Sequence, residues 1–389
     1  MDLSTLDKAV GMAKTPFYLF DTDAAAAQLA MLRAGLGREV KLCYAMKANP
    51  FLSGEIAATA DFLEVCSPGE FRICELAGVP MKKIVLSGVC KRQDDLEPIF
   101  SRGLQIGTYT VESVSQWELL SMLSQKYGRA IHVLLRLTSG AQFGMAEADL
   151  LCVLREAGKN PLVSVDGIQY FSGTQKKSEA KVREEWSRLD TFLEELKNQY
   201  GFTAEKLEYG PGFPVDYFGT DPGLEQRMLN CLNECLQSLR WQGIVVLEMG
   251  REIAASCGCY ITKVVDEKRV GSEHFAIVDG GIHQLHYDGQ MIGMQTPPVF
   301  QLHGGGRKET WTVFGALCTK NDVLLKEHPF FGLGTGSLLV FEKAGAYSVT
   351  EGMALFLSRE LPQVVLFSKR DGLRSVRAQI QTDIWNSPK

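Results

Sequence analysis

Short apolar runs alternate with longer amphipathic stretches from about residue 40 to residue 250. Each run is nearly continuous in apolar character, which is typical of strands buried on both faces of a parallel sheet. Between the runs, apolar residues recur at three- and four-residue steps, the spacing of an amphipathic helix. The predicted strands are 41–47, 61–67, 83–89, 104–110, 131–138, 165–172, 207–213 and 244–250, and the clearest helices are 69–79, 113–128, 181–200 and 224–239.

Eight strands, each followed by a helix, predict a (β/α)8 barrel, also called a TIM barrel. The alternative is an open doubly wound sheet, which usually carries a Gly-rich turn after its first strand. Neither GxGxxG nor GxxxxGK[ST] occurs in the sequence. The pattern therefore favours an α/β barrel.

The pattern changes after about residue 258, where short β-rich runs are divided by Gly, Asn, Asp and Pro. This predicts a C-terminal domain of antiparallel β-sheet, sandwich or barrel-like in form. The early run Phe17–Asp21 can add a strand to it. We therefore predict an N-terminal segment (1–29) that contributes to the β domain, a barrel (30–257) and the β domain itself (258–389).

Composition indicates an ordinary soluble protein. The 389 residues are 45% hydrophobic and 22% charged, enough for two domains that share an interface. The net charge of −5 is spread along the chain without a Lys/Arg cluster, so no nucleic-acid partner is expected. The N-terminus lacks a signal-peptide pattern and no apolar run is long enough to cross a membrane, which predicts a cytoplasmic location.

Metal binding is not the favoured interpretation anywhere in the sequence. The ten cysteines are scattered, many inside apolar runs, and are expected to be buried reduced thiols. Cys257 and Cys259 have no matching second pair. His283 and His286 lack a third ligand nearby, so a loop role near a cavity mouth or subunit interface is favoured for them.

Polar residues stand at the ends of the predicted barrel strands, where such barrels place their chemistry. The first strand ends in Lys47, whose amine is costly to bury unless it is paired, has a lowered pKa or is covalently bound. A strand-end lysine that reaches solvent remains an alternative. Glu64 lies in the second strand and Glu248 in the last, and a buried carboxylate there needs a cationic or proton-donating partner.

Glycines beside a hydroxyl group and an arginine near the last strands suit a phosphate, because glycine lets backbone N–H groups approach the oxygens. The residues concerned are Thr174, Gly210, Gly212 and Arg251. A lysine, a phosphate cradle and an acid around one cavity together indicate a site for pyridoxal 5′-phosphate (PLP).

Seven segments, in order along nearly the whole chain, resemble the motifs of the fold-type III PLP-dependent decarboxylases, the family of ornithine, diaminopimelate and arginine decarboxylases. In the second segment Glu64 stands where an aspartate is usual. The segments are YAMKANP, FLEVCSPGE, GIQYFSGTQ, LEYGPGFPVDY, LEMGREIAASCG, GALCTKND and FEKAGAYSV.

The resemblance implies catalytic roles for Lys47, Glu248 and Cys318. Lys47 would hold PLP as a Schiff base, and Glu248 would keep the pyridine nitrogen protonated as an electron sink. Cys318 of the partner subunit would govern protonation of the product carbon, which implies a homodimer with shared active sites. The resemblance also assigns a set of residues to the cofactor: Lys47, Glu64, Arg136, Phe171, Ser172, Gly173, Thr174, Gly210, Gly212, Glu248, Gly250, Arg251 and Tyr347.

Plainer roles remain open for some of these residues. Cys318 can be a buried core thiol, Tyr347 an ordinary packing residue and Arg251 a helix-end cation.

Four positions depart from the best-known family members. Phe171 replaces a stacking histidine, so it can stack but cannot hydrogen-bond. Pro211 replaces the middle glycine of the phosphate loop, and Met249 replaces a proline. Thr319 follows Cys318 at the position where enzymes that act on basic amino acids place an acid against the distal ammonium.

The last departure bears on the substrate, because a buried ammonium without a carboxylate would be poorly satisfied. Asp288 or Asp322 could still supply that charge, so the residues expected to face the substrate are Cys318, Thr319, Asp322, Asp288 and Tyr287. The sequences Phe-Ser-Gly-Thr-Gln and Leu-Cys-Thr resemble a side branch of the family, the decarboxylases of biosynthetic clusters. These can act on an aminoacyl group tethered to a carrier protein, as in butirosin assembly.

The resemblance thus implies α-decarboxylation of an amino acid or aminoacyl derivative to an amine and CO2. One alternative is a diaminopimelate-, lysine- or ornithine-type decarboxylase of free basic amino acids. A second is an alanine-racemase-like enzyme, but racemases usually place Arg rather than an acid such as Glu248 at the pyridine nitrogen. A third is a non-catalytic relative that binds a partner protein, against which the presence of Lys47, Glu248 and Cys318 argues.

Overall fold

The computed structural model describes residues 1–37, 39–287 and 294–388 and divides the chain into two compact units. The β unit comprises Met1–Ala27, Val215–Pro222 and Arg251–Lys389. The barrel unit comprises Gln28–Pro214 and Gly223–Gly250. Residues 215–222, which follow the seventh barrel strand, and residues 251–257 lie in the β unit, although both segments fall within the range 30–257 predicted for the barrel.

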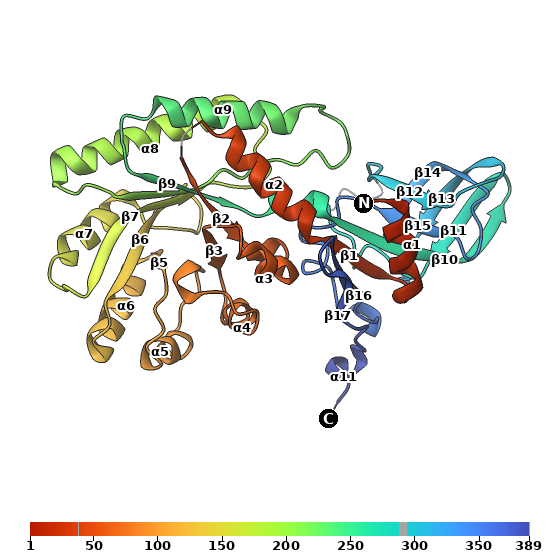
Figure 1. Cartoon of the computed structure of the whole chain (residues 1–389), viewed down its shortest axis with the longest axis horizontal. Coiled ribbons are helices and arrows are strands. Elements are labelled where there is room, and N and C mark those ends of the chain that lie inside the picture. Colours follow the sequence, from red (N-terminus) through yellow and green to blue (C-terminus); the bar gives the residue numbers. More distant parts are fainter. Residues whose placement is uncertain (38, 288–293, 389) are drawn as a thin grey trace. The chain divides into compact units, whose positions relative to one another are not determined.

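The barrel unit contains a closed barrel of eight strands whose neighbours are parallel, as the sequence predicted (Figure 1). Each predicted run overlaps one observed strand, and β9 pairs with β2 to close the barrel. The strands are β2 (Lys41–Ala45), β3 (Phe62–Val65), β4 (Ile84–Leu86), β5 (Thr108–Val111), β6 (Ile131–Leu137), β7 (Val163–Phe171), β8 (Lys206–Gly210) and β9 (Ile244–Met249).

Helices follow the barrel strands, and α4 to α9 lie around them in Figure 1. Local sequence sets their ends: the Ser67 hydroxyl accepts from the Glu70 N–H at the start of α4, and α8 ends at left-handed Gly201. The helices are α2 (Thr22–Gly35, which contains the unit boundary), α3 (Ser53–Ile56), α4 (Pro68–Leu76), α5 (Gln93–Ser101), α6 (Val114–Tyr127), α7 (Glu147–Ala157), α8 (Glu179–Tyr200) and α9 (Leu224–Ser238).

The barrel interior changes from apolar to polar along the strands. Cys43, Val85 and Val246 form a buried apolar cluster with the partly buried Phe62. Closer to the carboxyl ends of the strands the buried side chains are polar, which is where barrels of this type place their chemistry. These side chains are Glu64, Arg136, Gln169, Glu208 and Glu248.

The β unit contains a mixed sheet with the order β14-β13-β11-β10-β1-β16-β17. β1 (Phe17–Asp21) is antiparallel to β10 but parallel to β16, and β11 is parallel to β13. The prediction of a wholly antiparallel sheet was therefore too simple, because distant strands are free of the hairpin constraint that forces antiparallel pairing. The other strands are β10 (Gly258–Val270), β11 (Glu273–Val278), β12 (Val299–Leu302), β13 (Lys308–Phe314), β14 (Val323–Phe331), β15 (Leu338–Phe341), β16 (Gln363–Ser368) and β17 (Gly372–Arg377).

The first helix, α1 (Leu3–Met12), packs on this sheet. Its buried Leu6 and Ala9 share an apolar cluster with Phe17 and Leu19 of β1 and with Ile261 of β10. Two short helices, α10 (Arg251–Ala254) and α11 (Asp383–Asn386), complete the unit.

None of the helices in the described ranges combines the length and apolar character needed to span a bilayer. The ten cysteines all lie in those ranges and are free thiols; six are buried, whereas Cys90, Cys152 and Cys318 are exposed and Cys66 is intermediate.

Candidate active site

The ammonium of Lys47 lies between two buried carboxylates at the carboxyl end of the barrel. Lys47 follows β2 in the short turn Met46–Ala48. Its Nζ donates to Glu64 Oε2 at 2.5 Å and to Glu248 Oε1 at 3.1 Å. The Lys47 side chain is 40% exposed, whereas those of Glu64 and Glu248 are 5% and 7% exposed. The Lys47 side chain is therefore partly accessible, whereas both acids that hold its amine are sealed from water.

The charges of this cluster are strongly interdependent. Burial works against the charged form of Lys47, but Glu248 and Glu64 outweigh it and hold the Lys47 pKa well above its usual value. Burial also works against the charged form of Glu64, but the charge of Lys47 and several hydrogen bonds lower its pKa overall. Burial and the charge of Glu64 raise the pKa of Glu248 to about 7. Glu248 is thus the acid able to exchange a proton near neutral pH.

Gly250 allows the end of β9 to approach the end of β2. A Cβ at this position would lie 3.0 Å from both Ala45 O and Ala48 Cβ. A larger residue would force a small shift of these two strand ends, which carry Glu248 and Lys47.

Glycines also line the ends of β7 and β8. A Cβ on Gly210 would lie 2.4 Å from Phe171 Cδ2, and one on Gly212 would lie 2.0 Å from Gly173 O. Gly212 has φ +57° and Gly173 has φ +141°, values that favour glycine. The adjacent Thr174 is exposed. The residues predicted to hold the phosphate or to stack on the ring therefore lie together at two neighbouring strand ends. They are Phe171, Thr174, Gly210 and Gly212.

The hydroxyl of Ser172, another predicted cofactor contact, already has a protein partner. It donates to Glu185 Oε1 at 2.5 Å. Glu185 Oε2 also accepts from Lys176 Nζ and from Tyr209 Oη, each at 2.7 Å. A contact between Ser172 and the cofactor stays a prediction.

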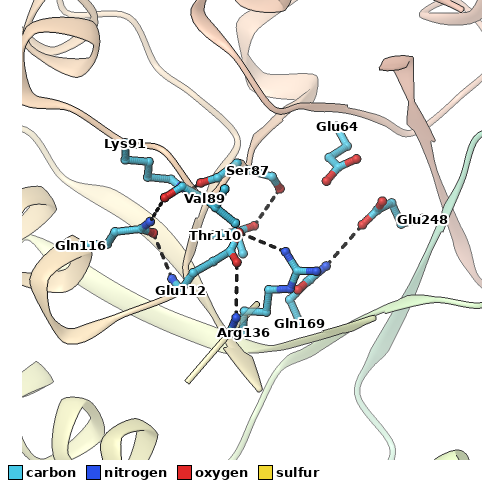
Figure 2. Close-up of polar contacts among 12 residues, drawn as sticks. Glu64, Ser87, Val89, Lys91, Thr110, Glu112, Gln116, Arg136, Gln169 and Glu248 are labelled. Carbon is cyan, nitrogen blue, oxygen red and sulfur yellow. Dashed lines mark hydrogen bonds and ion pairs between the residues drawn. The ribbon is translucent and has the colours of Figure 1, made fainter. Parts of the chain in front are cut away.

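Arg136 is fixed inside the barrel by a buried ion pair (Figure 2). Its Nη1 donates to Glu112 Oε1 at 3.0 Å, and its guanidinium lies 4.8 Å from the centroid of the Phe143 ring. The Gln116 side chain accepts from the Glu112 N–H and donates to Val89 O. Helix α6 thereby anchors the acid that holds Arg136.

Three polar side chains near this cluster were not identified from the sequence. Gln169 Nε2 donates to Glu248 Oε2 at 3.3 Å (Figure 2). Burial and the charges of Glu248 and Glu64 raise the pKa of Glu208 well above its usual value. Burial lowers the pKa of Lys91 to about 8. For Gln169 and Glu208 the available signal was a lone polar residue inside an apolar strand.

A cavity of about 260 Å³ adjoins the ends of β3 and β4 in the barrel unit. Helices α4 and α5 form its outer wall. Among the side chains that line it are Cys66, Ser87 and Lys91 from the strand ends and Phe71 and Ile99 from the helices. The cavity therefore lies at the same end of the barrel as Lys47.

Two further predicted phosphate ligands lie together in the β unit. Arg251 begins α10, and its Nη1 donates to Tyr217 Oη at 3.0 Å. Its guanidinium carbon lies 4.5 Å from the centroid of the Tyr347 ring. Tyr347 has φ +66°, an uncommon backbone conformation for a residue with a side chain.

Cys318 lies in a loop that is built on Asp322. The Asp322 carboxylate, 1% exposed, accepts the N–H groups of Ile282 at 2.8 Å and Leu317 at 2.7 Å. The Cys318 side chain itself is exposed. Backbone donors thus occupy the Asp322 carboxylate, and a direct contact with substrate stays a prediction.

The remaining predicted substrate residues are placed in different ways. Tyr287 is buried, and its hydroxyl donates to Glu342 O at 2.6 Å. Thr319 Oγ1 accepts from the Asn321 N–H at 3.4 Å. Asp288 lies outside the described residues.

Potential metal ligands do not converge in the ranges that the structure describes, where no group of three His, Cys, Asp or Glu side chains could hold an ion. His286 Nε2 lies 2.9 Å from Glu351 Oε2, and His283 is buried.

Comparison with known proteins identifies the family. The model of the "Pyridoxal-dependent decarboxylase, pyridoxal binding domain" family matches residues 23–255. The L-glutamyl-[BtrI acyl-carrier protein] decarboxylase of Niallia circulans is 27% identical, over 92% of this chain and 90% of that protein. The diaminopimelate decarboxylase of Zymomonas mobilis is 25% identical, over 86% of this chain and 82% of that protein.

A solved structure supports the same architecture. The structure of Helicobacter pylori diaminopimelate decarboxylase complexed with L-lysine superposes with a TM-score of 0.83 at 23% identity, over 98% of both chains. This similarity confirms the fold predicted from the sequence, a TIM barrel with a C-terminal β domain.

The family match covers more than half of the chain and includes Lys47, Glu64 and Glu248. It confirms the resemblance drawn from the motifs and the prediction of a PLP-dependent enzyme that decarboxylates amino acids. The chain belongs to the pyridoxal-dependent decarboxylase family.

Proposed function

We propose that Lys47 carries PLP and that the surrounding site removes the α-carboxylate of an aminoacyl derivative or modified amino acid, giving an amine and CO2. The observation that carries the proposal is the partly exposed Lys47 side chain, whose amine is held between the sealed carboxylates of Glu64 and Glu248. Such an arrangement presents a nucleophilic amine beside an acid suited to a ring nitrogen.

The residues present fit this cofactor. The glycines at the ends of β7 and β8 leave backbone room that a Cβ on Gly210 or Gly212 would fill. Phe171 offers an aromatic face at the same strand end. When bound, PLP supplies a protonated pyridine ring that accepts the electrons left on Cα as CO2 departs.

The protein groups supply the proton transfers that this chemistry needs. Lys47 must lose a proton before it can act as a nucleophile. Glu248 Oε1 lies 3.1 Å from Lys47 Nζ, close enough to accept this proton, but the higher pKa of Lys47 makes the transfer uphill before the amine reacts. With the cofactor bound, Glu248 would be the acid that faces the ring nitrogen and would hold a proton there. Glu64 keeps a negative charge beside the amine throughout.

The substrate assignment rests on the missing counter-charge for a distal ammonium. Thr319 stands where an acid would be needed, and the backbone N–H groups of Ile282 and Leu317 occupy the Asp322 carboxylate. A substrate without a distal ammonium suits this loop, such as the aminoacyl group on a carrier protein that the Niallia circulans relative uses. The second candidate is a free diaminopimelate-type substrate, as in the Zymomonas mobilis relative.

The proposal includes a homodimer in which Cys318 of the partner subunit completes each site. Cys318 is exposed in the single chain. Four apolar side chains in one segment of the same unit are also unusually exposed: Met353 (46%), Leu355 (45%), Phe356 (44%) and Leu357 (49%). Exposed apolar patches of this kind support a protein–protein contact, here with a second copy of the chain.

The Lys47 assignment is tested with Lys47→Ala, with Lys197→Ala at an exposed position of α8 as the control. Lys47→Ala should abolish both CO2 release and the absorbance band of the lysine-bound cofactor, whereas Lys197→Ala should keep both. An unchanged spectrum and rate in Lys47→Ala would remove the central assignment.

The substrate class is tested by measuring CO2 release from L-glutamyl-S-pantetheine, L-glutamate, L-lysine and meso-diaminopimelate. We expect turnover of the thioester to exceed that of each free amino acid. Preferred turnover of lysine or diaminopimelate would favour the second candidate. Exchange of enantiomers without CO2 release would indicate a racemase instead.

A further inference from the structure

Two buried oxygen acceptors lie side by side in the barrel wall. Gln169 of β7 and Glu208 of β8 are each 1% exposed. Within the described residues, neither Gln169 Oε1 nor Glu208 Oε1 has a hydrogen-bond partner. The two residues are register partners on adjacent parallel strands, so their side chains project from the same face of the sheet.

One proton would satisfy both oxygens. A buried acceptor without a donor is unfavourable, because it has lost its hydrogen bonds to water and gained none in return. The oxygen of an amide does not carry a proton near neutral pH, whereas a carboxyl group can. Glu208 is therefore the group of the two that can supply an O–H.

The surroundings of Glu208 favour its neutral form. Burial raises its pKa well above the usual value, and the charges of Glu248 and Glu64 raise it further. The positive charges of Lys47 and Arg136 oppose this rise in the Glu208 pKa. The thiol of Cys43 in β2 also faces the three acids, and burial and their charges raise its pKa. If Glu64, Glu208 and Glu248 were all ionised, the single positive charge of Lys47 would not balance them. The excess negative charge would then be buried, which is costly.

We propose that Glu208 remains protonated and donates its O–H to the Gln169 amide oxygen, which fixes the amide with its N–H group toward Glu248. Gln169 Nε2 does donate to Glu248 Oε2, at 3.3 Å (Figure 2). This donor favours the ionised form of Glu248, the form that faces a ring nitrogen in the proposed function. If the amide turned over, its oxygen would meet the carboxylate and repel it.

Glu208 is thus a positioning residue that acts through Gln169, and this role rests on the proposed function. The role explains why an acid is tolerated at a sealed position of the barrel, since the proton of Glu208 is used and not its charge.

The proton on Glu208 can be detected without cofactor. Infrared spectra of the cofactor-free protein at neutral pH should contain the carbonyl stretch of a protonated carboxyl group that disappears in Glu208→Gln. Glu205→Gln, at an exposed position before β8, should keep that band. If wild type and Glu208→Gln gave the same carboxyl spectrum, Glu208 would be ionised and the proposal would be overturned.

The positioning role is tested by kinetics. In Glu208→Gln an amide N–H replaces the carboxyl O–H, so kcat should stay within about threefold of wild type. Glu208→Met keeps the bulk but removes the donor, and kcat should fall about tenfold or more while KM and PLP affinity change little. The pH profile of kcat should move to higher pH, because Glu248 ionises less readily without the fixed amide. Thermal melting checks that the variants fold.

A double variant tests whether Glu208 acts through Gln169. Gln169→Met combined with Glu208→Met should be no slower than Gln169→Met alone. An equal loss in Glu208→Gln and Glu208→Met would show that ionised Glu208 acts as a base, and an undiminished rate in Glu208→Met would show that it only fills space. Either result overturns the proposal. Failure of the wild-type protein to bind PLP would instead overturn the proposed function, and the infrared result would still decide the protonation of Glu208.

Discussion

At the scale of single residues, the charge of Glu248 depends on the groups around it. Its pKa is raised to about 7 in the folded protein by burial and by Glu64, against a usual value of 4.5. Between pH 4.5 and about 7, Glu248 is more protonated in the folded state than in the unfolded state. Unfolding therefore releases protons and becomes more favourable as pH rises. The stability that protonated Glu248 contributes is therefore full below pH 4.5 and is lost as pH rises through 7.

The first prediction follows from this dependence. In the cofactor-free protein, the unfolding free energy of wild type minus that of Glu248→Gln should decrease by on the order of 3 kcal/mol between pH 4.5 and 8. Chemical denaturation across this range measures the difference. Glu118→Gln, at an exposed position of α6, serves as the control and should show no such trend. A difference independent of pH would mean that Glu248 is ionised throughout.

The second prediction concerns the contact between Gly210 and the Phe171 ring. A methyl group at Gly210 would lie 2.4 Å from Phe171 Cδ2, closer than any real contact, so Gly210→Ala should displace the ring. PLP affinity should fall by about tenfold or more, since an aromatic contact contributes about 0.5–1.5 kcal/mol and the neighbouring turn must also shift. Fluorescence titration with PLP measures the loss.

Gly158→Ala is the matched control, because Gly158 has an ordinary helical backbone and open space around its Cβ position. This variant should bind PLP as wild type does. Equal affinity in both variants would show that Phe171 does not lie against the cofactor.

At the scale of elements, Asp322 joins two loops that carry predicted substrate residues. Its carboxylate fills the space that a Cβ on Gly315 or Gly281 would need, at 2.2 Å and 2.7 Å. The two glycines and the acid therefore depend on one another. Burial raises the pKa of Asp322, while the bonded N–H groups of Ile282 and Leu317 oppose that rise.

The third prediction is that Asp322→Ala destabilises the β unit. Two buried backbone N–H groups would lose their acceptor, which should reduce the unfolding free energy by about 2–4 kcal/mol. Asp322→Asn should lose less, because the amide oxygen still accepts. Thermal or chemical denaturation measures both, with Asp383→Ala at an exposed position of α11 as the control. If Asp322→Ala were as stable as wild type, the carboxylate of Asp322 would not be needed for folding, and a role in substrate binding would be favoured instead.

The barrel strands could be predicted because a strand buried on both faces has a continuous apolar sequence, as in Ile244–Met249. Strand β5, the fourth strand of the barrel, begins at Thr108 rather than at 104, because apolar residues before it continue the pattern outside the strand. The parallel pairing of β1 with β16 could not be predicted, since no local signal links Phe17–Asp21 to residues near the other end of the chain.

The site was predictable to the extent that its residues carry motifs. Lys47, Glu64 and Glu248 were identified from their strand-end positions, and the structure brings them within hydrogen-bond distance. Gln169 and Glu208 were missed because their roles depend on which residues lie beside them, and strand register sets those neighbours. An apolar run indicates only that a polar residue within it is buried. Register is a property of the closed barrel, not of any one strand.

At the scale of the whole molecule, the proposal that each site is shared concerns a second chain. The exposed segment from Met353 to Leu357 and the exposed Cys318 both belong to the β unit. A patch of apolar side chains left in water is unfavourable, by roughly 25 cal/mol for each Å² that a contact could cover. Burying this segment against a second copy would remove that cost and would bring Cys318 of the partner subunit to an interface.

The fourth prediction is therefore that replacing Phe356 and Leu357 together by Asp weakens the dimer. Two charges in a buried apolar contact should raise the dimer dissociation constant by about a hundredfold or more, because each uncompensated charge costs several kcal/mol. Sedimentation should show monomer at concentrations where wild type is dimeric. Specific activity should fall on dilution along with the dimer, while melting of the monomer stays cooperative.

The control for this prediction is Val270→Asp, which charges an isolated apolar side chain that is 59% exposed at the end of β10. This variant should remain dimeric and active, since a lone exposed apolar residue does not indicate a contact. Cys318→Ala then separates assembly from chemistry: it should leave the dimer and PLP binding intact but change the protonation of the product, whereas Cys152→Ala should change neither. If the Phe356/Leu357 variant were monomeric yet fully active, each chain would contain a complete site, and the shared-site part of the proposal would be wrong.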